Sequence, residues 1–203
     1  MHHNKTEGSM VKNVLVTMTD KEFRRLSEFI SAECGIKMPP TKKIMLETRL
    51  RKRLRHHKMR SFKEYCDYLF SPDGMKNELI HMIDVVTTNK TDFFREPAHF
   101  EYILEKALPL SIETYGAGFK RSFSVWSVGC STGEEPYSLA IVLSEFAENH
   151  PGFRFEILAT DISTNVLNAA LSGIYKEERI DCIPMYLREK YFLRSRDPTK
   201  LLA

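Results

Sequence analysis

The sequence lacks the features that mark membrane and secreted proteins. No apolar run approaches the roughly 20 residues that a membrane-spanning helix needs, and the polar start Met-His-His-Asn-Lys has no apolar segment of the kind a signal peptide contains. Its cysteines form no Cys-x-x-Cys pair, being spread over Cys34, Cys66, Cys130 and Cys182. Neither a disulfide framework nor a zinc site is expected, so we expect reduced cysteines in a cytoplasmic protein.

Recognisable metal-binding and acid–base clusters are also missing. The seven histidines show no i,i+4 pair with acids at ligand spacing, so we assign no metal. A chain of 203 residues that is 42% hydrophobic and 28% charged suits an ordinary globular protein. Its length allows one large domain or two small ones.

Acidic residues are almost absent from one segment. Between Thr41 and Arg60 lie nine Lys or Arg and a single acid, Glu47, a net charge of +8; since the whole chain carries +3, the rest carries −5. At about 100° per residue, a helix here turns its leucines toward a core and its charges outward. A solvated polar face is the ordinary interpretation, but the lack of compensating acids favours a surface for an acidic partner.

The first part of the chain predicts helices. Thr19 and Glu22 form a capping box before an apolar stripe, and Ser71-Pro72-Asp73-Gly74 predicts a turn. Helices are expected from about 19 to 34, 42 to 57, 62 to 70 and 76 to 86. We expect residues 1–18 to be a disordered lead-in and residues 19–87 to form a small all-helical domain.

The pattern changes after residue 87. Residues 88–96 are aperiodic and predict a linker, and residues 97–203 follow as a second domain. In that domain we expect a helix, a strand, a helix, a second strand and a helix, over 97–115, 123–128, 134–148, 155–159 and 164–171. This rhythm is typical of a parallel, doubly wound sheet, so the fold class is α/β.

The chemistry is expected at the loop Gly129–Gly133, between the first strand and a helix N-terminus. Glycines there let a ligand approach the backbone. Asp161, at the end of the second strand, suits two hydrogen bonds to ribose hydroxyls, although it could simply cap the next helix. The loop lacks the full G-x-G-x-x-G pattern. Glu134-Glu135 would repel a phosphate, so a cationic mononucleoside such as S-adenosylmethionine fits better than a dinucleotide.

Four stretches resemble those of one family. Thr87–Glu96 and Trp126–Ser138 look like the two signature stretches of the CheR-type chemotaxis protein methyltransferases, and Ala159–Ser163 and Ser172–Tyr175 resemble the two stretches that follow. The likeness runs from about residue 19 to 193 in the family's order. It implies an N-terminal all-helical, receptor-docking domain followed by a partial Rossmann-like methyltransferase domain.

The resemblance also implies an activity and its residues. The family transfers a methyl group from S-adenosylmethionine to receptor glutamates, leaving S-adenosylhomocysteine and a glutamate methyl ester. Arg95 matches the arginine nearest the methyl transfer and is our candidate catalytic residue, the alternative being a surface ion pair with Asp92 or Glu96. The matched cofactor-binding residues, with the loop glycine, are Asn89, Thr91, Arg95, Gly129, Glu135 and Asp161. Phe93 and Phe94 are expected to seat the linker by packing.

The basic helix matches the family's receptor-facing helix. The expected docking residues are Arg49, Arg51, Lys52, Arg53 and Arg55, and their partner is the acidic, helical cytoplasmic region of chemotaxis receptors. Replacing Arg51 and Arg55 with Glu is expected to weaken receptor binding and spare cofactor binding. Nucleic acid is not an expected partner, because one basic helix without interleaved aromatics offers bases nothing to stack on. Membrane insertion is not expected either, because no apolar run is long enough to span a bilayer.

The family's pattern continues beyond residue 203 with further strands, a β-subdomain and an active-site tyrosine. A truncated gene product, an expressed fragment and a chain that needs a second polypeptide all remain open as explanations. Two strands make a marginal sheet, so we expect this chain alone to bind S-adenosylmethionine weakly and to have little or no activity. The alternative to an enzyme is a non-catalytic module that binds receptors.

Overall fold

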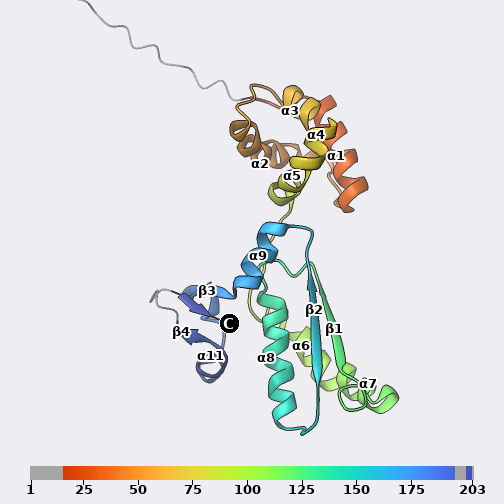
Figure 1. Cartoon of the computed structure of the whole chain (residues 1–203), viewed down its shortest axis with the longest axis vertical. Coiled ribbons are helices and arrows are strands. Elements are labelled where there is room, and N and C mark those ends of the chain that lie inside the picture. Colours follow the sequence, from red (N-terminus) through yellow and green to blue (C-terminus); the bar gives the residue numbers. More distant parts are fainter. Residues whose placement is uncertain (1–15, 195–199, 203) are drawn as a thin grey trace, which may run out of the picture. The chain divides into compact units, whose positions relative to one another are not determined.

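The computed structural model describes residues 16–194 and 200–202. The chain divides into two compact units, Met1–Val86 and Thr87–Ala203 (Figure 1). The first unit ends at Val86, one residue before the domain end at residue 87 that the sequence predicts. Within the part of the chain that the structure describes, no helix has both the length and the apolar character to cross a membrane.

The first unit is all helical in its described part. Its elements are α1 (Asp20–Cys34), a 3-10 turn (Pro40–Lys42), α2 (Lys43–His56), α3 (Phe62–Leu69), α4 (Pro72–Asn77) and α5 (Leu79–Val86). The predicted capping box opens α1: the Thr19 hydroxyl accepts from the Glu22 N–H, and the Glu22 carboxylate accepts from the Thr19 N–H. Gly35 ends the same helix in the left-handed conformation that glycine tolerates best.

The turn predicted at Ser71–Gly74 is wrong, and so is the single helix predicted over 76–86. Ser71 instead caps a helix, because its hydroxyl accepts from the Gly74 N–H at 3.1 Å and Pro72 occupies the first helical position. Ser-Pro is a signal for turns and for helix starts alike. The segment therefore forms α4 and α5, with Glu78 between them.

The lead-in predicted over 1–18 extends too far. Residues 1–15 lie outside the described residues. Met18, however, is only 3% exposed and packs into the helical core, and its N–H donates to Glu47 at 2.9 Å. The unit therefore begins before its first helix.

The core of this unit is continuous across its helices. Its buried side chains include the three leucines of α2, which the charge pattern turns inward as predicted: Leu46, Leu50 and Leu54. They pack with apolar residues of the other helices, among them Leu26, Ile30, Phe62, Leu69 and Met82. The basic character of α2 thus lies on a helix that is anchored by its apolar face.

One carboxylate is buried beside this core. Glu78 has no exposed surface, and Arg53 donates to both of its oxygens, at 2.8 and 2.6 Å. The Tyr65 hydroxyl donates to it at 2.8 Å, and His57 Nε2 lies 2.7 Å from Oε2. Burial alone would raise the pKa of Glu78, but the bonds from Arg53, His57 and Tyr65 outweigh it and hold this pKa below its usual value.

Arg53, one of the five residues expected to dock the receptor, is therefore engaged inside the unit. Its side chain is 14% exposed and is bound to Glu78. Arg51 is also engaged, because its guanidinium pairs with Glu47 and donates to the Val16 carbonyl. The Arg49 guanidinium donates to the Val86 carbonyl. Of the five predicted residues, Lys52 and Arg55 are the ones on the exposed face of α2.

The second unit contains the predicted strand–helix rhythm. Its elements are α6 (Pro97–Tyr102), a π-helical turn (Ile103–Ala107), α7 (Leu108–Tyr115), β1 (Phe123–Val128), α8 (Glu134–Glu148), β2 (Phe155–Thr160), α9 (Thr164–Ser172), β3 (Ile174–Lys176), α10 (Glu177–Ile180), α11 (Met185–Tyr191), β4 (Leu193–Arg194) and β5 (Lys200–Leu202). The helix predicted over 97–115 is thus helical throughout, with a π-helical turn in its middle.

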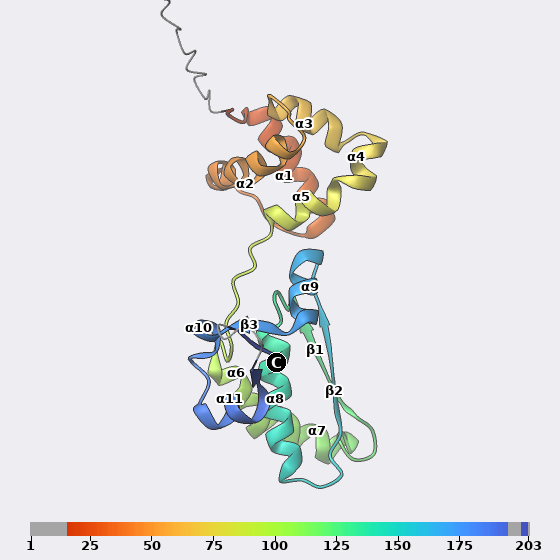
Figure 2. The same ribbon diagram turned by 60° about the vertical axis from the view of Figure 1, so that its left-hand side comes forward.

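Strands β1 and β2 pair in parallel, with Phe123 opposite Phe155 and Val128 opposite Thr160. One face of this pair packs against α7 and α8 through a cluster that includes Leu108, Leu143 and Phe153. Figure 2 shows α8 lying along that face. The carboxyl ends of both strands therefore lie at the N-terminal end of α8.

A second sheet was not predicted. Strands β3, β5 and β4 form a small antiparallel sheet in that order. The three strands are only two or three residues long, too short for an alternating pattern to distinguish them from loops.

Removal of the buried carboxylate should destabilise the first unit. We expect Glu78→Ala to lower the free energy of unfolding by about 3–5 kcal/mol, because Arg53 loses its partner in a nearly buried position. Asp67→Ala is the matched control: Asp67 pairs with Lys63 and Arg25 on the surface, where such pairs contribute at most about 1 kcal/mol. Denaturant unfolding followed by circular dichroism gives both values, and equal losses would contradict the account.

The same carboxylate should make stability depend on pH. Folding lowers the pKa of Glu78. Its ionised form therefore stabilises the folded state fully at pH values above the ordinary pKa of a glutamate, about 4.3. That contribution is lost as the pH falls through the lowered pKa. Unfolding measured from pH 7 to pH 3 should therefore show a smaller loss on acidification for Glu78→Ala than for the wild type. Parallel curves would argue against this network.

Candidate functional site

The loop after β1 is fixed to the end of β2 by backbone hydrogen bonds. The N–H groups of Gly129 and Cys130 both donate to the Thr160 carbonyl, at 2.8 and 2.9 Å. The Ser131 N–H donates to Asp161 Oδ2 at 2.9 Å, and the Gly133 N–H closes the loop on the Cys130 carbonyl at 3.0 Å. Four of the five loop N–H groups are thus already used within the protein.

Asp161 serves the loop and the following turn at once. Besides accepting from Ser131, its carboxylate accepts from the Ser163 N–H at 2.9 Å, just before α9. The N-cap residue of α9 is Ser163, so Asp161 does not cap the helix itself but fixes the turn before it. An ionised carboxylate can accept about four hydrogen bonds, so two backbone donors leave capacity for ligand hydroxyls.

The two loop glycines meet different requirements. Gly133 has φ +98°, and a Cβ there would lie 2.7 Å from the Tyr175 hydroxyl and 3.0 Å from Ala170 Cβ. Gly129 has φ +77°, but nothing lies within 4 Å of the place where its Cβ would be. Gly133 thus permits close packing inside the protein, whereas Gly129 leaves an open approach to the backbone.

The two adjacent glutamates at the start of α8 have different surroundings. Glu134 is 1% exposed, accepts from the Thr132 hydroxyl at 2.6 Å and forms an ion pair with Arg179. Glu135 is exposed and accepts from the Ser127 hydroxyl at 2.6 Å. Two phosphate-repelling carboxylates were expected here, but Glu134 is buried and paired, so of the two Glu135 alone presents its charge to a ligand.

The linker 88–96 is seated on the second unit by its backbone and by Phe93. The Phe93 ring is 2% exposed and lies between Tyr175 and Phe192, with centroid distances of 4.9 and 5.6 Å. The Phe94 N–H donates to the Ser138 hydroxyl at 2.9 Å. The Ser131 hydroxyl donates to the Asn89 carbonyl at 2.9 Å. The expectation that Phe93 packs agrees with this position.

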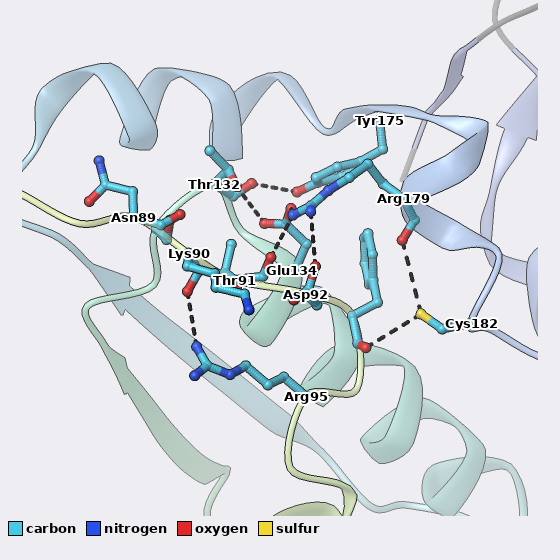
Figure 3. Close-up of polar contacts among 12 residues, drawn as sticks. Asn89, Lys90, Thr91, Asp92, Arg95, Thr132, Glu134, Tyr175, Arg179 and Cys182 are labelled. Atoms are coloured by element: carbon cyan, nitrogen blue, oxygen red, sulfur yellow. Dashed lines mark hydrogen bonds and ion pairs between the residues drawn. The ribbon is translucent and has the colours of Figure 1, made fainter.

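Part of the linker borders a cavity of about 180 Å³ beside the loop. Of the residues predicted to bind the cofactor, the cavity brings together Thr91, Arg95, Gly129 and Glu135; the other lining residues are Lys90, Asp92, Glu96, His99 and Phe100. Two predicted residues, Asn89 and Asp161, are not in this lining. Asn89 meets the loop through its carbonyl, and Figure 3 shows its side chain directed away from the group around Arg179.

The Arg95 side chain is exposed and borders the cavity, and its guanidinium donates to the Lys90 carbonyl at 3.0 Å. Asp92, one of the two acids that the alternative interpretation paired with Arg95, binds Arg179 instead at 2.9 Å. Asp92 is therefore engaged by another arginine, and Arg95 is among the residues that line the cavity.

Arg179 is a residue of the site that sequence reasoning missed. From the short helix α10 its guanidinium donates to Asp92 Oδ1 at 2.9 Å and to the Thr91 carbonyl at 2.6 Å, and it pairs with Glu134 (Figure 3). Asp92 and Arg179 are 87 positions apart in the sequence. No periodicity or motif connects them, although Arg179 follows the fourth of the resembling stretches, Ser172–Tyr175, by four residues.

Comparison with known proteins supports the resemblance seen in the four stretches. A family model described as "CheR methyltransferase, SAM binding domain" matches residues 89–201, and one described as "CheR methyltransferase, all-alpha domain" matches residues 21–87. The chain is 40% identical over 186 residues to a chemotaxis protein methyltransferase of Borreliella burgdorferi, covering 91% of this chain and 65% of the relative. For one of Escherichia coli the identity is 36% over 183 residues, covering 90% and 60%. The chain thus spans less than two thirds of the length of these relatives.

The contrast between the loop glycines can be tested by stability. Gly133→Ala should lower the free energy of unfolding by about 2–4 kcal/mol, because a positive φ costs about 1 kcal/mol and the added methyl overlaps Tyr175 and Ala170. Gly129→Ala should cost only the first part. Thermal and denaturant unfolding of both variants measure the difference. A loss for Gly129→Ala as large as that for Gly133→Ala would show that the approach to Gly129 is not open.

Proposed function

Because the chain belongs to the CheR methyltransferase family, we propose that its second unit binds S-adenosylmethionine at the cavity beside Gly129. We propose further that the whole protein transfers the cofactor's methyl group to glutamate side chains of chemotaxis receptors. The observation that carries the proposal is the meeting of Thr91, Arg95 and Glu135 around that open glycine. These side chains come from two segments that resemble the family's signature stretches.

The donors of the loop fit a nucleoside without phosphates. A phosphate-binding loop offers free backbone N–H groups to its ligand, but here Gly129, Cys130, Ser131 and Gly133 donate theirs to protein oxygens. Among the groups that line the cavity, the exposed carboxylate of Glu135 is an acceptor for hydroxyl or ammonium groups. The cavity is smaller than the roughly 300–1,000 Å³ of pockets that enclose a whole ligand, so it would hold one part of the cofactor.

The cofactor, when bound, supplies an activated methyl group on a sulfonium. The substrate glutamate is ionised at neutral pH, since its unperturbed pKa is about 4.3, and therefore needs no general base. The task of this chain's residues is then to position the reactants. Glu135, oriented by the Ser127 hydroxyl, would fix the cofactor, and Asp161 would accept from its ribose hydroxyls. Arg95, steadied by the Lys90 carbonyl, would contact the cofactor and orient the substrate carboxylate.

The first unit offers a surface for the receptor. Lys52 and Arg55 are exposed on α2, in the segment whose net charge is +8, and they complement an acidic partner. We propose that they meet the cytoplasmic helical region of chemotaxis receptors, which places the protein in the cytoplasm. The alternative function, a non-catalytic receptor-binding module, draws support from the compactness of this unit, because it would allow docking without catalysis.

Cofactor binding is the first test. We expect Glu135→Gln and Arg95→Ala each to weaken S-adenosylhomocysteine binding by about tenfold or more, since a hydrogen bond to a charged group contributes about 1.5–3 kcal/mol. Calorimetric titration of the 203-residue chain measures the ratio, even where absolute binding is weak. Glu156→Gln is the matched control, because Glu156 likewise accepts from a serine, Ser124, but on the exposed face of the sheet. Equal effects of Glu135→Gln and Glu156→Gln would contradict the site.

Receptor docking is the second test, with the residues that the structure leaves exposed. Lys52→Glu together with Arg55→Glu should weaken binding to a receptor cytoplasmic fragment several-fold, and the loss should shrink as salt rises, because exposed charges are screened within about 8 Å at physiological ionic strength. Lys120→Glu with Arg121→Glu, an exposed pair on the second unit, controls for net charge. Pull-downs across salt concentrations provide the comparison. Equal losses for both pairs would argue against a specific surface on α2.

A further inference from the structure

The linker that borders the cavity has a strained backbone. Phe94 has φ +51° and Glu96 has φ +54°, values in the left-handed region that residues other than glycine seldom adopt. Such residues persist where surrounding contacts hold them. The linker also carries Thr91 and Arg95, which border the cavity. Their position therefore depends on whatever holds the linker in this conformation.

The segment 174–192 supplies most of those contacts. Phe93 belongs to a buried cluster whose other members come from this segment and from α8: Ile141, Tyr175, Ile180, Ile183, Leu187 and Phe192. The Cys182 thiol lies 3.5 Å from the Phe93 carbonyl oxygen. These apolar contacts hold the linker at Phe93, in the middle of its length, but they do not reach Thr91 and Asp92.

Arg179 makes the polar contacts at that earlier part of the linker. It donates to the Thr91 carbonyl and to Asp92, and it pairs with Glu134 on the first turn of α8. The Glu134 carboxylate is almost fully buried, so this pair is a fixed point from which the arginine can hold the linker. Arg179 itself does not line the cavity.

We propose that Arg179 is a positioning residue that latches the linker to the start of α8 and thereby holds Thr91 and Arg95 at the cofactor site. The guanidinium suits this role because its planar fork serves several acceptors at once, which an ammonium cannot do in the same geometry. The cofactor part of the inference rests on the proposed function. The latch itself does not, because it concerns contacts within the second unit.

Trypsin gives a direct readout of the latch, since the linker contains two of its cleavage sites, after Lys90 and after Arg95. In Arg179→Gln, cleavage at these two bonds should become about tenfold faster, the effect of losing charge-assisted hydrogen bonds to the linker. Arg179→Lys should rescue part of the effect. Digestion is done well below the melting temperature, and mass spectrometry identifies the cut bonds.

Two further variants separate a latch from general instability. Arg188→Gln is the control, because Arg188 binds Asp181 and the Ile183 carbonyl in the same segment and does not touch the linker; its linker cleavage should equal that of the wild type. Arg179→Gln leaves Glu134 buried and unpaired, so Arg179→Gln/Glu134→Gln removes that charge. The double variant should regain thermal stability and still be cut rapidly in the linker. Wild-type cleavage in this double variant would overturn the proposal.

Titration of the same proteins with S-adenosylhomocysteine distinguishes the two proposals. If both hold, the wild type binds and the Arg179→Gln/Glu134→Gln variant binds about tenfold more weakly. Rapid linker cleavage in that variant, combined with no binding by the wild type, would support the latch and overturn the cofactor site. Wild-type binding together with unchanged linker cleavage would support the cofactor site and overturn the latch.

Discussion

The buried carboxylate of Glu134 is the constraint on which the arrangement of the second unit depends. An ionised side chain without solvent needs a partner and hydrogen bonds, and Glu134 obtains them from Thr132 and from Arg179, 45 positions later. The same arginine binds the linker. One charge therefore connects the loop, the start of α8, the linker and the segment after β3. Without this pair, the residues that border the cavity would lack a common support.

The function proposed for the loop follows from the contrast between two neighbours. Successive residues of a helix point about 100° apart, so Glu134 turns into the protein when Glu135 turns outward. Glu134 then stabilises the fold, and Glu135 remains as the exposed acceptor beside Gly129. The first unit also has a buried carboxylate, Glu78, which is paired with an arginine, Arg53 of the basic helix α2.

Local signals predicted local structure. The capping box at Thr19, both parallel strands and α8 could be read from the sequence because spacing alone defines them. The sequence could not predict which charged side chains turn inward to a partner. Arg53 is an example, because its partner Glu78 lies 25 positions away, between two helices. The role of Arg179 could not be predicted for the same reason, because its partners Asp92 and Glu134 are distant in the sequence. The strands of the small antiparallel sheet are too short to carry a periodic signal. What failed was pairing over long sequence distances.

The claim that the linker and the loop together form the cofactor site is tested most directly by hydrogen–deuterium exchange of the 203-residue chain with and without S-adenosylhomocysteine. Amide exchange reports how often each backbone N–H opens to solvent. The account predicts that saturating ligand slows exchange in peptides covering residues 88–96 and 129–135, with little change in α1 to α5. Slowing confined to other segments, at ligand concentrations where calorimetry shows binding, would contradict it.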